Sequence, residues 1–441
     1  MLQSVTNWLD RRTGYRRLLS PIRSRILPNG PSWWYTTASC LLWLLVVEIA
    51  TGLLLMVTYT PSTASAWGSV HYIEQQWAGT FLRGVHYYGA QAMIVLFGIH
   101  VARVLLAAAF RAPRELVWVT GLLLIPLVLV WSITGNPLSG TQTGMAQIDV
   151  EGQIVGSTPM VGKLLKRVLL GGDQVGQLTL TRLYFLHVGL LPLLVAGLLV
   201  IHITQIYRHG LSQTGTTGRK PARTYWPHQT ARNMLALGLV LGTVGFLAWK
   251  YGAPLDVPAD LDLPHNPRPE WYFRWLFELR RYFTGDTEFI ATEVIPGAIL
   301  VFLLAIPLVD HVLSKRASFV TRLLIVIIGC GGWTALTFRS LVRDWLDDQY
   351  QAAEAQSTEL AARARALADK NGIPPQGAAA LLQNDPKTQG PILFSRHCAS
   401  CHSHIDANGK GIESEEPSAP NLFGFATRRW LVGFLDPDQI A

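Results

Sequence analysis

Long apolar stretches alternate with short polar connections along most of the chain. Crossing a hydrocarbon core about 30 Å thick takes about 20 apolar residues in a helix. Windows of this kind lie at 36–58, 85–108, 115–135, 184–206, 233–252, 292–313 and 320–342. The pattern predicts an all-α fold class, a polytopic bundle of about seven membrane-spanning helices. A composition of 49% hydrophobic and 15% charged residues excludes an ordinary soluble domain.

Basic residues predict the orientation of this bundle, because short connections rich in Arg and Lys stay on the cytoplasmic side. They gather at the N-terminus and in alternate connections: Arg103, Arg111 and Arg114; Arg208, Arg219, Lys220, Arg223 and Arg232; Lys315, Arg316 and Arg322. We expect an integral protein of a bacterial-type energy-conserving inner membrane, with a cytoplasmic N-terminus. Everything after about residue 343 then lies on the outer, periplasmic side. The net charge of +8 reflects this bias and is no argument for nucleic acid.

The composition changes after the last apolar window. AAEAQSTELAARARALADK is an Ala-rich polar helix pattern, and NGIPPQG interrupts it. We interpret residues 346–388 as a linker and residues 389–441 as a second module.

Four histidines occur in two matched pairs inside the apolar windows. His86 and His100 are 14 residues apart, and His187 and His202 are 15 residues apart. In a helix each pair spans about 21–23 Å and stays within about 60° of one face. Two levels of two rings fit a flat macrocycle whose iron takes two axial nitrogens: His86 with His187 at the outer level, His100 with His202 at the inner level. Helix capping or polar bundle contacts are the alternative, at a high cost for ionisable groups in lipid.

Small residues and arginines accompany the same two levels. Helix positions without bulk, spaced 14 residues apart, would let ring edges pass; they are Ala38, Gly52, Gly121 and Gly135. Arg83 and Arg114 stand beside the outer and inner levels, where a guanidinium can pair with haem propionates. Ordinary interfacial arginines are the alternative.

Several segments resemble cytochrome b of quinol–cytochrome c oxidoreductases: RGVHYYGAQAMIVLFGIHVARV, RAPRELVWVTG and GGDQVGQLTLTRLYFLHVGLLP. The longer second histidine spacing is similar to the cytochrome b6 branch, and NPRPEWYF at 266–273 resembles the PEWY quinol-site motif. The resemblance covers about residues 20–345. It implies a cytochrome b6-like four-helix haem b domain at 1–215 and a subunit IV-like three-helix quinol-site domain at 216–345.

The PEWY segment predicts a site for quinol oxidation, which releases protons and needs a carboxylate in a partly dry pocket. Glu270 is the expected base, and Tyr272 is expected to be catalytic with it. Pro269, Trp271 and Tyr272 are expected to line the quinol pocket with Glu270 and to raise its pKa by desolvation. An interfacial aromatic belt with a solvated Glu270 is the alternative.

Two departures from the family pattern stand out. The loop after the third span usually reads close to GYxLPWxQ, whereas here it reads GNPLSGTQ, so the outer wall of the pocket is expected to be built differently. The cysteine that holds an extra inner haem in the b6 branch falls on Thr36, one turn before Cys40. A buried small residue is the favoured interpretation of Cys40, and a third inner haem is the alternative.

The second module contains C-x-x-C-H, formed by Cys398, Cys401 and His402. The thiols can bind haem vinyl groups covalently while the histidine binds the iron. A zinc site, with the same two thiolates and His397, His402 or His404, is the competing interpretation. GPILFSRHCASCH and PNLFGFATRRWLVGFL resemble small class I cytochromes c. No methionine follows Met234, so the sixth ligand is another group such as His404 or His397, or the site is open, or the chain continues past residue 441.

Together these features predict a fused cytochrome b and c subunit of a proton-translocating quinol–cytochrome c oxidoreductase. Its expected cofactors are two haems b, one covalent haem c and quinone. Its expected partners are a Rieske [2Fe–2S] protein, a downstream cytochrome c or other acceptor, membrane lipid and, from the family, a second copy in a homodimer. Arg208, His209 and Asp310 are weak candidates at the inner quinone site. A diheme anchor of a non-bifurcating quinone-linked dehydrogenase and a transporter with structural metal sites are the alternatives.

Overall fold

The computed structural model describes residues 2–17, 20, 24–27, 30–212, 223–261, 263, 267–436 and 438. The chain divides into two compact units, Met1–Ser357 and Thr358–Ala441, which we describe separately. The expected domain border at 215/216, the basic residues Arg219 and Lys220, and Asn266 of the PEWY-containing motif lie outside the described residues.

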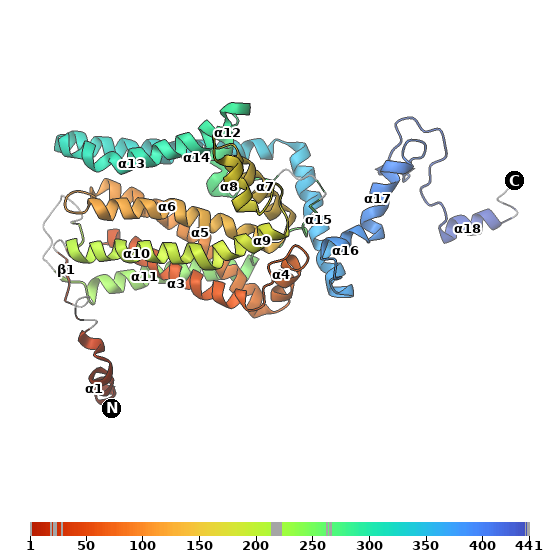
Figure 1. Cartoon of the computed structure of the whole chain (residues 1–441). Helices are drawn as coiled ribbons and strands as arrows, with labels where there is room; N and C mark the ends of the chain where they lie inside the picture. Colours follow the sequence, from red (N-terminus) through yellow and green to blue (C-terminus); the bar gives the residue numbers. More distant parts are fainter. Residues whose placement is uncertain are drawn as a thin grey trace. The chain divides into compact units, whose positions relative to one another are not determined.

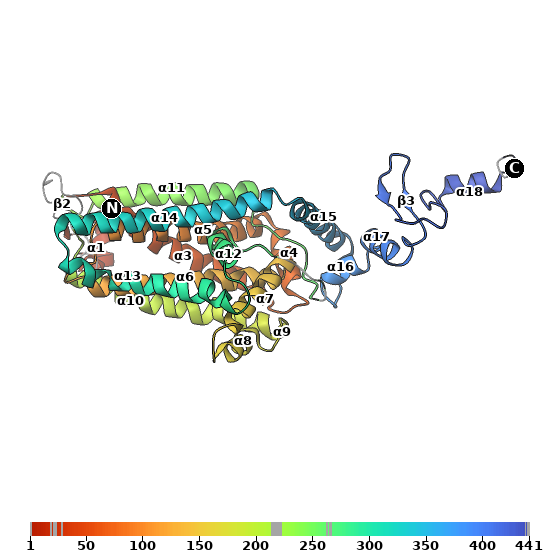
Figure 2. The ribbon, with the colours of Figure 1, turned by 90° about the horizontal axis from the view of Figure 1, so that it is seen from above.

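Long helices run side by side in the first unit (Figures 1 and 2). They are α3 (Thr36–Met56), α5 (Trp77–Leu106), α6 (Glu115–Gly135), α10 (Leu191–His209), α11 (His228–Tyr251), α13 (Ile295–Val312) and α14 (Lys315–Trp345). With their flanking turns they form seven helical segments long and apolar enough to cross a membrane. The predicted all-α fold and the predicted seven spans are therefore confirmed for the part of the chain that the structure describes.

Shorter elements connect and flank the spans. The helices are α1 (Leu2–Thr13), α4 (Ala66–Glu74), α7 (Gln142–Gly156), α8 (Gly162–Leu170), α9 (Gln177–Tyr184) and α12 (Arg274–Arg280). Turns of 3-10 type lie at Trp33–Tyr35, Asn136–Ser139, Trp271–Phe273 and Gly285–Thr287, and π-helical turns lie at Phe185–Leu190 and Ile290–Val294. Strand β1 (Ile26–Leu27) pairs antiparallel with β2 (Arg223–Thr224), with Ile26 opposite Thr224.

The second unit is also mainly helical. Helix α15 (Asp348–Asn371) begins in the first unit, and α16 (Ala379–Gln383), α17 (Pro386–His397) and α18 (Arg428–Leu435) follow it. Strands β3 (His404–Ile405) and β4 (Gly411–Ile412) form a two-residue antiparallel pair. The expected Ala-rich helix is α15, and it ends where the NGIPPQG segment begins.

The second span starts earlier than its apolar window, at Trp77 rather than at residue 85. Arg83 lies inside this added part of α5 and forms an ion pair with Glu74 of α4. A compensated charge near a helix end is compatible with the membrane interface, so hydropathy alone places this helix start too late.

The interior of the bundle is filled by two apolar clusters. One joins α3, α6 and α10 through residues such as Leu45, Trp131 and Val195. The other joins α5, α6 and α13, where Trp118 also donates its indole N–H to the carbonyl of Leu303 at 2.8 Å. These contacts hold α5, α6 and α10 in fixed register around the four histidines.

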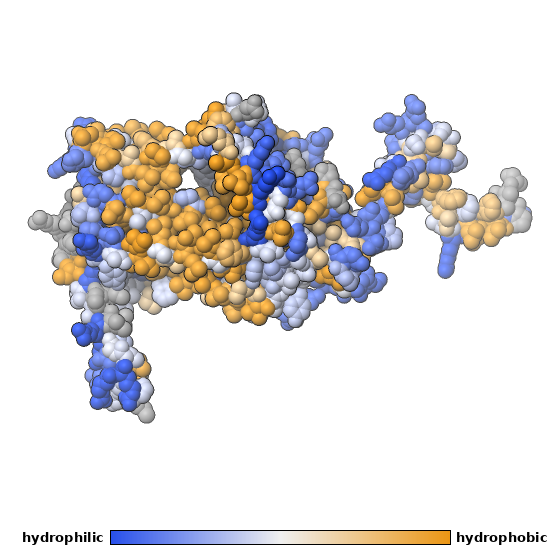
Figure 3. Space-filling view, viewed as in Figure 1, coloured by the Kyte–Doolittle hydropathy of each residue, from blue (hydrophilic) through white to orange (hydrophobic). Residues whose placement is uncertain are grey.

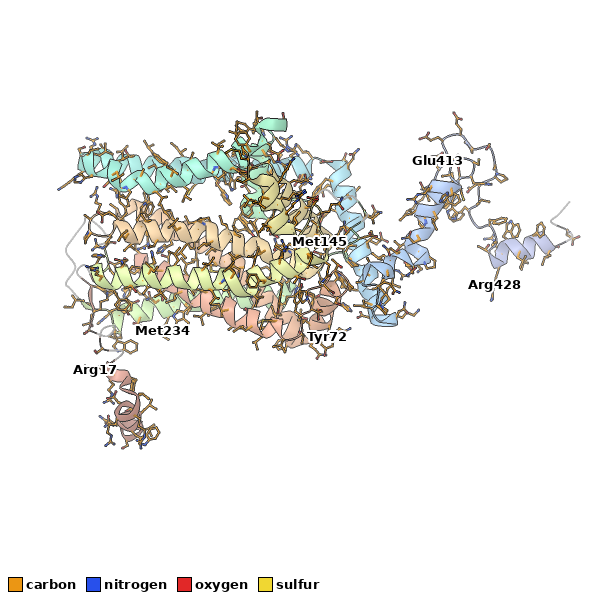
Figure 4. All side chains as sticks on the ribbon, viewed as in Figure 1. Arg17, Tyr72, Met145, Met234, Glu413 and Arg428 are labelled. Atoms are coloured by element: carbon orange, nitrogen blue, oxygen red, sulfur yellow. The ribbon has the colours of Figure 1, made fainter. Side chains whose placement is uncertain are left out.

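Apolar side chains also cover the flanks of the bundle, and hydrophilic residues gather toward the ends of its helices (Figure 3). Such a surface is stable only next to lipid, so the chain is an integral membrane protein. Tyr72 of α4 and Met145 of α7 lie at one end of the bundle, and Met234 of α11 lies at the other (Figure 4). We call the end with α4 and α7 the outer end, following the expected orientation.

Candidate functional site

His86 of α5 and His187 of the π-helical turn before α10 face each other toward the outer end. Their ring centroids are 6.3 Å apart and their planes differ by 77°. An iron bonded to two imidazole nitrogens at about 2 Å each requires a centroid separation of about 6 Å. His100 and His202 come from the same two helices and interact electrostatically with each other. The structure thus brings together both predicted pairs, with an iron-sized gap at the outer level.

Each of the four histidines has a threonine hydroxyl beside its ring nitrogen Nδ1. The Oγ1 to Nδ1 distances are 2.9 Å for Thr51 and His86, 3.0 Å for Thr120 and His202, 3.1 Å for Thr37 and His100, and 3.2 Å for Thr134 and His187. Three of these hydroxyls already donate their hydrogen to a backbone carbonyl of their own helix, at 2.7–2.9 Å. Those three oxygens must accept from Nδ1–H, which leaves Nε2 free to bind a metal.

Sequence reasoning missed these threonines, although a simple signal marks them. Each one directly precedes one of the four small residues: Thr37–Ala38, Thr51–Gly52, Thr120–Gly121 and Thr134–Gly135. A Thr-small dipeptide repeated every 14 residues on two helices therefore places a threonine hydroxyl beside each imidazole.

The glycines of these dipeptides give the histidine rings their space. A Cβ atom added to Gly135 would lie 2.7 Å from Cε1 of His187, one added to Gly121 would lie 3.1 Å from Cε1 of His202, and one added to Gly52 would lie 3.3 Å from Cε1 of His86. The bulk-free positions predicted for haem edges thus lie against the sides of the ligand rings.

We expect Gly135→Ala to weaken binding of the outer haem by about 10- to 100-fold, the range typical for disturbing the support of a metal ligand. A methyl group at 2.7 Å must push His187 out of line. The measurement is the b-haem content per purified chain, by the pyridine haemochrome assay. Gly98→Ala on α5 is the control, because its Cβ meets nothing within 4 Å. An unchanged outer haem in the Gly135 variant would contradict this account.

The arginines at the two levels have partners in the protein. Arg83 pairs with Glu74 and donates to the carbonyls of Ala253 and Pro254, at 3.0 and 2.5 Å. Arg114 donates to the carbonyls of residues 209–211 at 3.2–3.4 Å. Their pairing with haem propionates stays a prediction.

Arg103, three residues after His100 on α5, was not singled out from the sequence. It is 9% exposed, and its Nε atom has no hydrogen-bond partner among the described residues. A buried, incompletely paired cation beside the inner histidines suits an acidic group of a bound ligand. A spacing of three residues from an expected iron ligand is the signal that could have found it.

A cavity of about 430 Å³ opens beside the outer histidine pair. Its lining includes His86, His187, Gly52, Gly135 and Glu270, together with apolar side chains of α3, α5 and α6. The predicted iron ligands and the predicted quinol-site carboxylate therefore share one space.

Glu270 is half-buried at this cavity, and its Oε1 accepts a hydrogen bond from Nδ2 of Asn136 at 3.1 Å. Asn136 belongs to GNPLSGTQ, the loop that departs from the family pattern, so the altered loop contacts the carboxylate directly. Burial raises the pKa of Glu270, while the Asn136 hydrogen bond and the charge of Arg274 oppose this shift.

The other residues of the PEWY segment have different surroundings. Of Pro269, Glu270, Trp271 and Tyr272, all of which the structure describes, Glu270 alone is in the cavity lining. Trp271 donates its indole N–H to Gln91 of α5 at 2.5 Å, and the hydroxyl of the buried Tyr272 lies 2.9 Å from that of Ser132 of α6. These two aromatic residues attach the segment to the bundle.

Several weaker candidates are engaged in ordinary structural contacts. Thr36 donates to the carbonyl of Trp33 at 2.7 Å, and Cys40 is 2% exposed. Asp310 is buried and accepts from Arg111 at 2.6 Å and from Ser318.

The C-x-x-C-H segment follows α17 in the second unit. Nδ1 of His402 lies 2.8 Å from the carbonyl oxygen of Pro420, which can only accept, so Nε2 of His402 stays available for a metal. Among the described residues, no group of three or more His, Cys, Asp or Glu side chains is arranged to hold a metal ion.

Comparison with known proteins gives these features a context. A family profile described as cytochrome b (N-terminal)/b6/petB matches residues 91–258. Cytochrome b6 of Synechococcus sp. (strain JA-3-3Ab) is 34% identical over 212 residues, which are 48% of this chain and 99% of that protein. The chain belongs to the cytochrome b family. Cytochrome b6 of Emiliania huxleyi, also 34% identical over 212 residues, agrees.

A solved structure extends the likeness in fold beyond this region. The structure titled "Hyperthermophilic respiratory Complex III" matches with a TM-score of 0.66 and 22% identity, over 84% of this chain and 98% of that chain. Membership of the cytochrome b family implies b-type haem and a place in electron transport. The paired histidines, three of them with Nε2 free to bind a metal, the glycines against their rings and the buried Arg103 fit that cofactor.

Proposed function

We propose that this cytochrome b-family chain is the fused cytochrome b and c subunit of a quinol–cytochrome c oxidoreductase, and that it oxidises quinol in the outer cavity. One observation carries the proposal: Glu270 and the histidines His86 and His187 line the same cavity. A cavity of about 430 Å³ with many apolar side chains suits a quinone ring, since such pockets are mostly apolar with a few polar groups.

In this proposal Glu270 accepts a proton from the quinol hydroxyl. Its raised pKa makes the carboxylate a better base than a solvated one, and Asn136 holds one of its oxygens at the cavity. When bound, the two haems would supply a one-electron path between the outer and inner levels. The four histidines would hold the irons, and the threonines beside them fix the ring orientation.

We further propose that Cys398 and Cys401 would hold a haem c covalently and that His402 would bind its iron. The hydrogen bond from His402 to Pro420 supports this role. Large apolar side chains of the same unit stay exposed, among them Phe423, Phe425, Trp430 and Phe434. A haem held by Cys398 and Cys401 would give such exposed side chains an apolar group to pack against.

The proposed complex needs partners. The chain has four cysteines, two in membrane spans and two in the C-x-x-C-H motif, and we propose that a Rieske [2Fe–2S] protein joins it as a separate chain. We propose a homodimeric assembly with the second unit on the periplasmic side, an acceptor such as a cytochrome c, quinone reduction at the inner side, and coupled proton translocation.

Glu270→Gln tests the proposal. A positioned general base contributes about 10²- to 10⁴-fold, so quinol oxidation by the purified complex should fall by about 100-fold or more. A carboxyl group with a raised pKa is protonated below that pKa, so the wild-type rate should rise with pH through it, and the variant should lose this rise. The measurement is the pH profile of steady-state quinol oxidation.

Glu288→Gln is the matched control, because Glu288 lies in the same connection but forms an ion pair with Arg280. It should keep both the rate and the pH profile. A Glu270 variant with the wild-type rate would exclude Glu270 as the base.

A further inference from the structure

Two arginines flank the PEWY segment and share one buried carboxylate. Arg268 directly precedes Pro269, and Arg274 directly follows Phe273. Nε of Arg268 donates to Oδ1 of Asp344 at 2.8 Å, and Nη1 of Arg274 donates to Oδ2 at 2.5 Å. Asp344 lies near the end of α14 and is 6% exposed. The two ends of the segment are therefore tied to one point on another helix.

These charges are largely buried, so breaking the ion pairs with Asp344 is costly. The side chains of Arg268 and Arg274 are 18% and 13% exposed. Both oxygens of Asp344 are used, and the loss of one partner from a buried ion pair leaves an uncompensated charge. The arrangement therefore resists any shift that would pull either end of the segment away from α14.

Arg268 and Asp344 also contact the first turns of α15. The guanidinium of Arg268 lies 4.3 Å from the ring centroid of Tyr350, and Nε2 of Gln351 donates to the backbone carbonyl of Asp344 at 2.9 Å. Glu354 lines the cavity beside Glu270. These residues belong to the first unit, so the chain that leaves the last span helps to build the cavity wall.

We propose that Asp344 is a positioning residue for quinol oxidation, because its clamp on Arg268 and Arg274 holds Glu270 at the cavity. The proposal rests on the proposed function of Glu270. Asn136 alone gives Glu270 one side-chain hydrogen bond, which fixes one oxygen but not the backbone that carries it. The two aromatic residues that follow Glu270 attach the middle of the segment to the bundle, and the clamp fixes its two ends. A misplacement of about 1 Å can cost about 100-fold in rate.

Asp344→Asn tests the proposal, with Glu278→Gln as a matched control. Glu278 of α12 is 2% exposed and accepts from Arg343 at 2.8 Å and Arg339 at 3.0 Å, both on α14. The control thus weakens a buried ion pair between the same two helices, but outside the PEWY segment. Both variants are compared in the purified complex with decylubiquinol and with a short-chain menaquinol.

We expect Asp344→Asn to lower kcat about 10- to 100-fold with a much smaller change in KM, since the base is displaced while the cavity remains. Backbone amides of residues 270–274 should exchange hydrogen faster, with both b haems retained. Glu278→Gln should keep kcat and the exchange of this segment. Equal losses of kcat in the two variants, or a slow Asp344 variant with unchanged exchange, would overturn the proposal.

Two further variants keep the outcome decisive. If the Asp344 variant does not retain its haems, Arg268→Gln and Arg274→Gln replace it, because each leaves Asp344 one partner; both should show the same loss of kcat. If Glu270→Gln is slow and Asp344→Asn is as fast as the wild type, the positioning role of Asp344 is disproved and the proposed function of Glu270 stands. If Glu270→Gln is as fast as the wild type, the proposed function of Glu270 is itself disproved.

Discussion

His187→Leu should leave the purified chain with its inner b haem and without its outer one. The ring of His187 faces that of His86 at a centroid distance of 6.3 Å, and leucine offers no nitrogen to an iron between them. Disturbing only the support of a metal ligand costs about 10- to 100-fold in affinity, so removal of the ligand should abolish binding. Quinol oxidation should fall to background in the same preparation. The measurement is the haemochrome count combined with a redox titration of the b-band absorbance.

His202→Leu is the matched control, because it removes a ligand of the inner pair on the same helix. It should lose the inner haem, and the outer cavity with Glu270 should persist. A chain that keeps both b haems after loss of His187 would disprove the assignment of the outer pair.

Replacement of both Cys398 and Cys401 by alanine should remove all covalently bound haem. Thioether bonds need these thiols, and the haem c site offers no other cysteine among the described residues, since Cys40 and Cys330 lie in α3 and α14. The haem that resists acid-acetone extraction should fall to zero, and the extractable b haem should stay constant. Haem staining after denaturing electrophoresis gives an independent check.

Cys330→Ala is the control for this experiment, because Cys330 is an exposed thiol of a membrane span. A double variant that loses bound zinc instead of covalent haem would establish the zinc interpretation of the motif. Retention of covalent haem would point to Cys40, the other candidate for an attachment site.

Periodicity was sufficient to predict the spans and the histidine pairs. A run of 20 apolar residues has few alternatives to a membrane helix, and four ionisable rings in two such runs are too costly to be incidental. The glycines followed from the same register. The start of α5 could not be predicted in this way, because hydropathy does not reveal that Glu74 compensates the charge of Arg83.

Contacts between distant parts of the chain were beyond the reach of pattern reasoning. Threonine is common in membrane helices, so the sequence does not single out Thr51. Its role follows from the structure, in which its Oγ1 lies 2.9 Å from Nδ1 of His86. The departing loop GNPLSGTQ indicated a different pocket wall, but the sequence could not show that Asn136 reaches Glu270 across 134 residues. Likewise, Asp344 is one acid among several near the end of α14 until Arg268 and Arg274 converge on it.

The π-helical turn Phe185–Leu190 also explains why the two histidine spacings differ by one residue. In a regular α-helix, 15 residues would rotate His202 about 60° from His187, and a wider turn takes up part of this rotation. The extra residue is thus absorbed locally and does not misalign the inner ring. In genetic terms, we expect a one-codon deletion after His187 within this turn to give a regular helix that still presents His187 and His202 on nearly the same face.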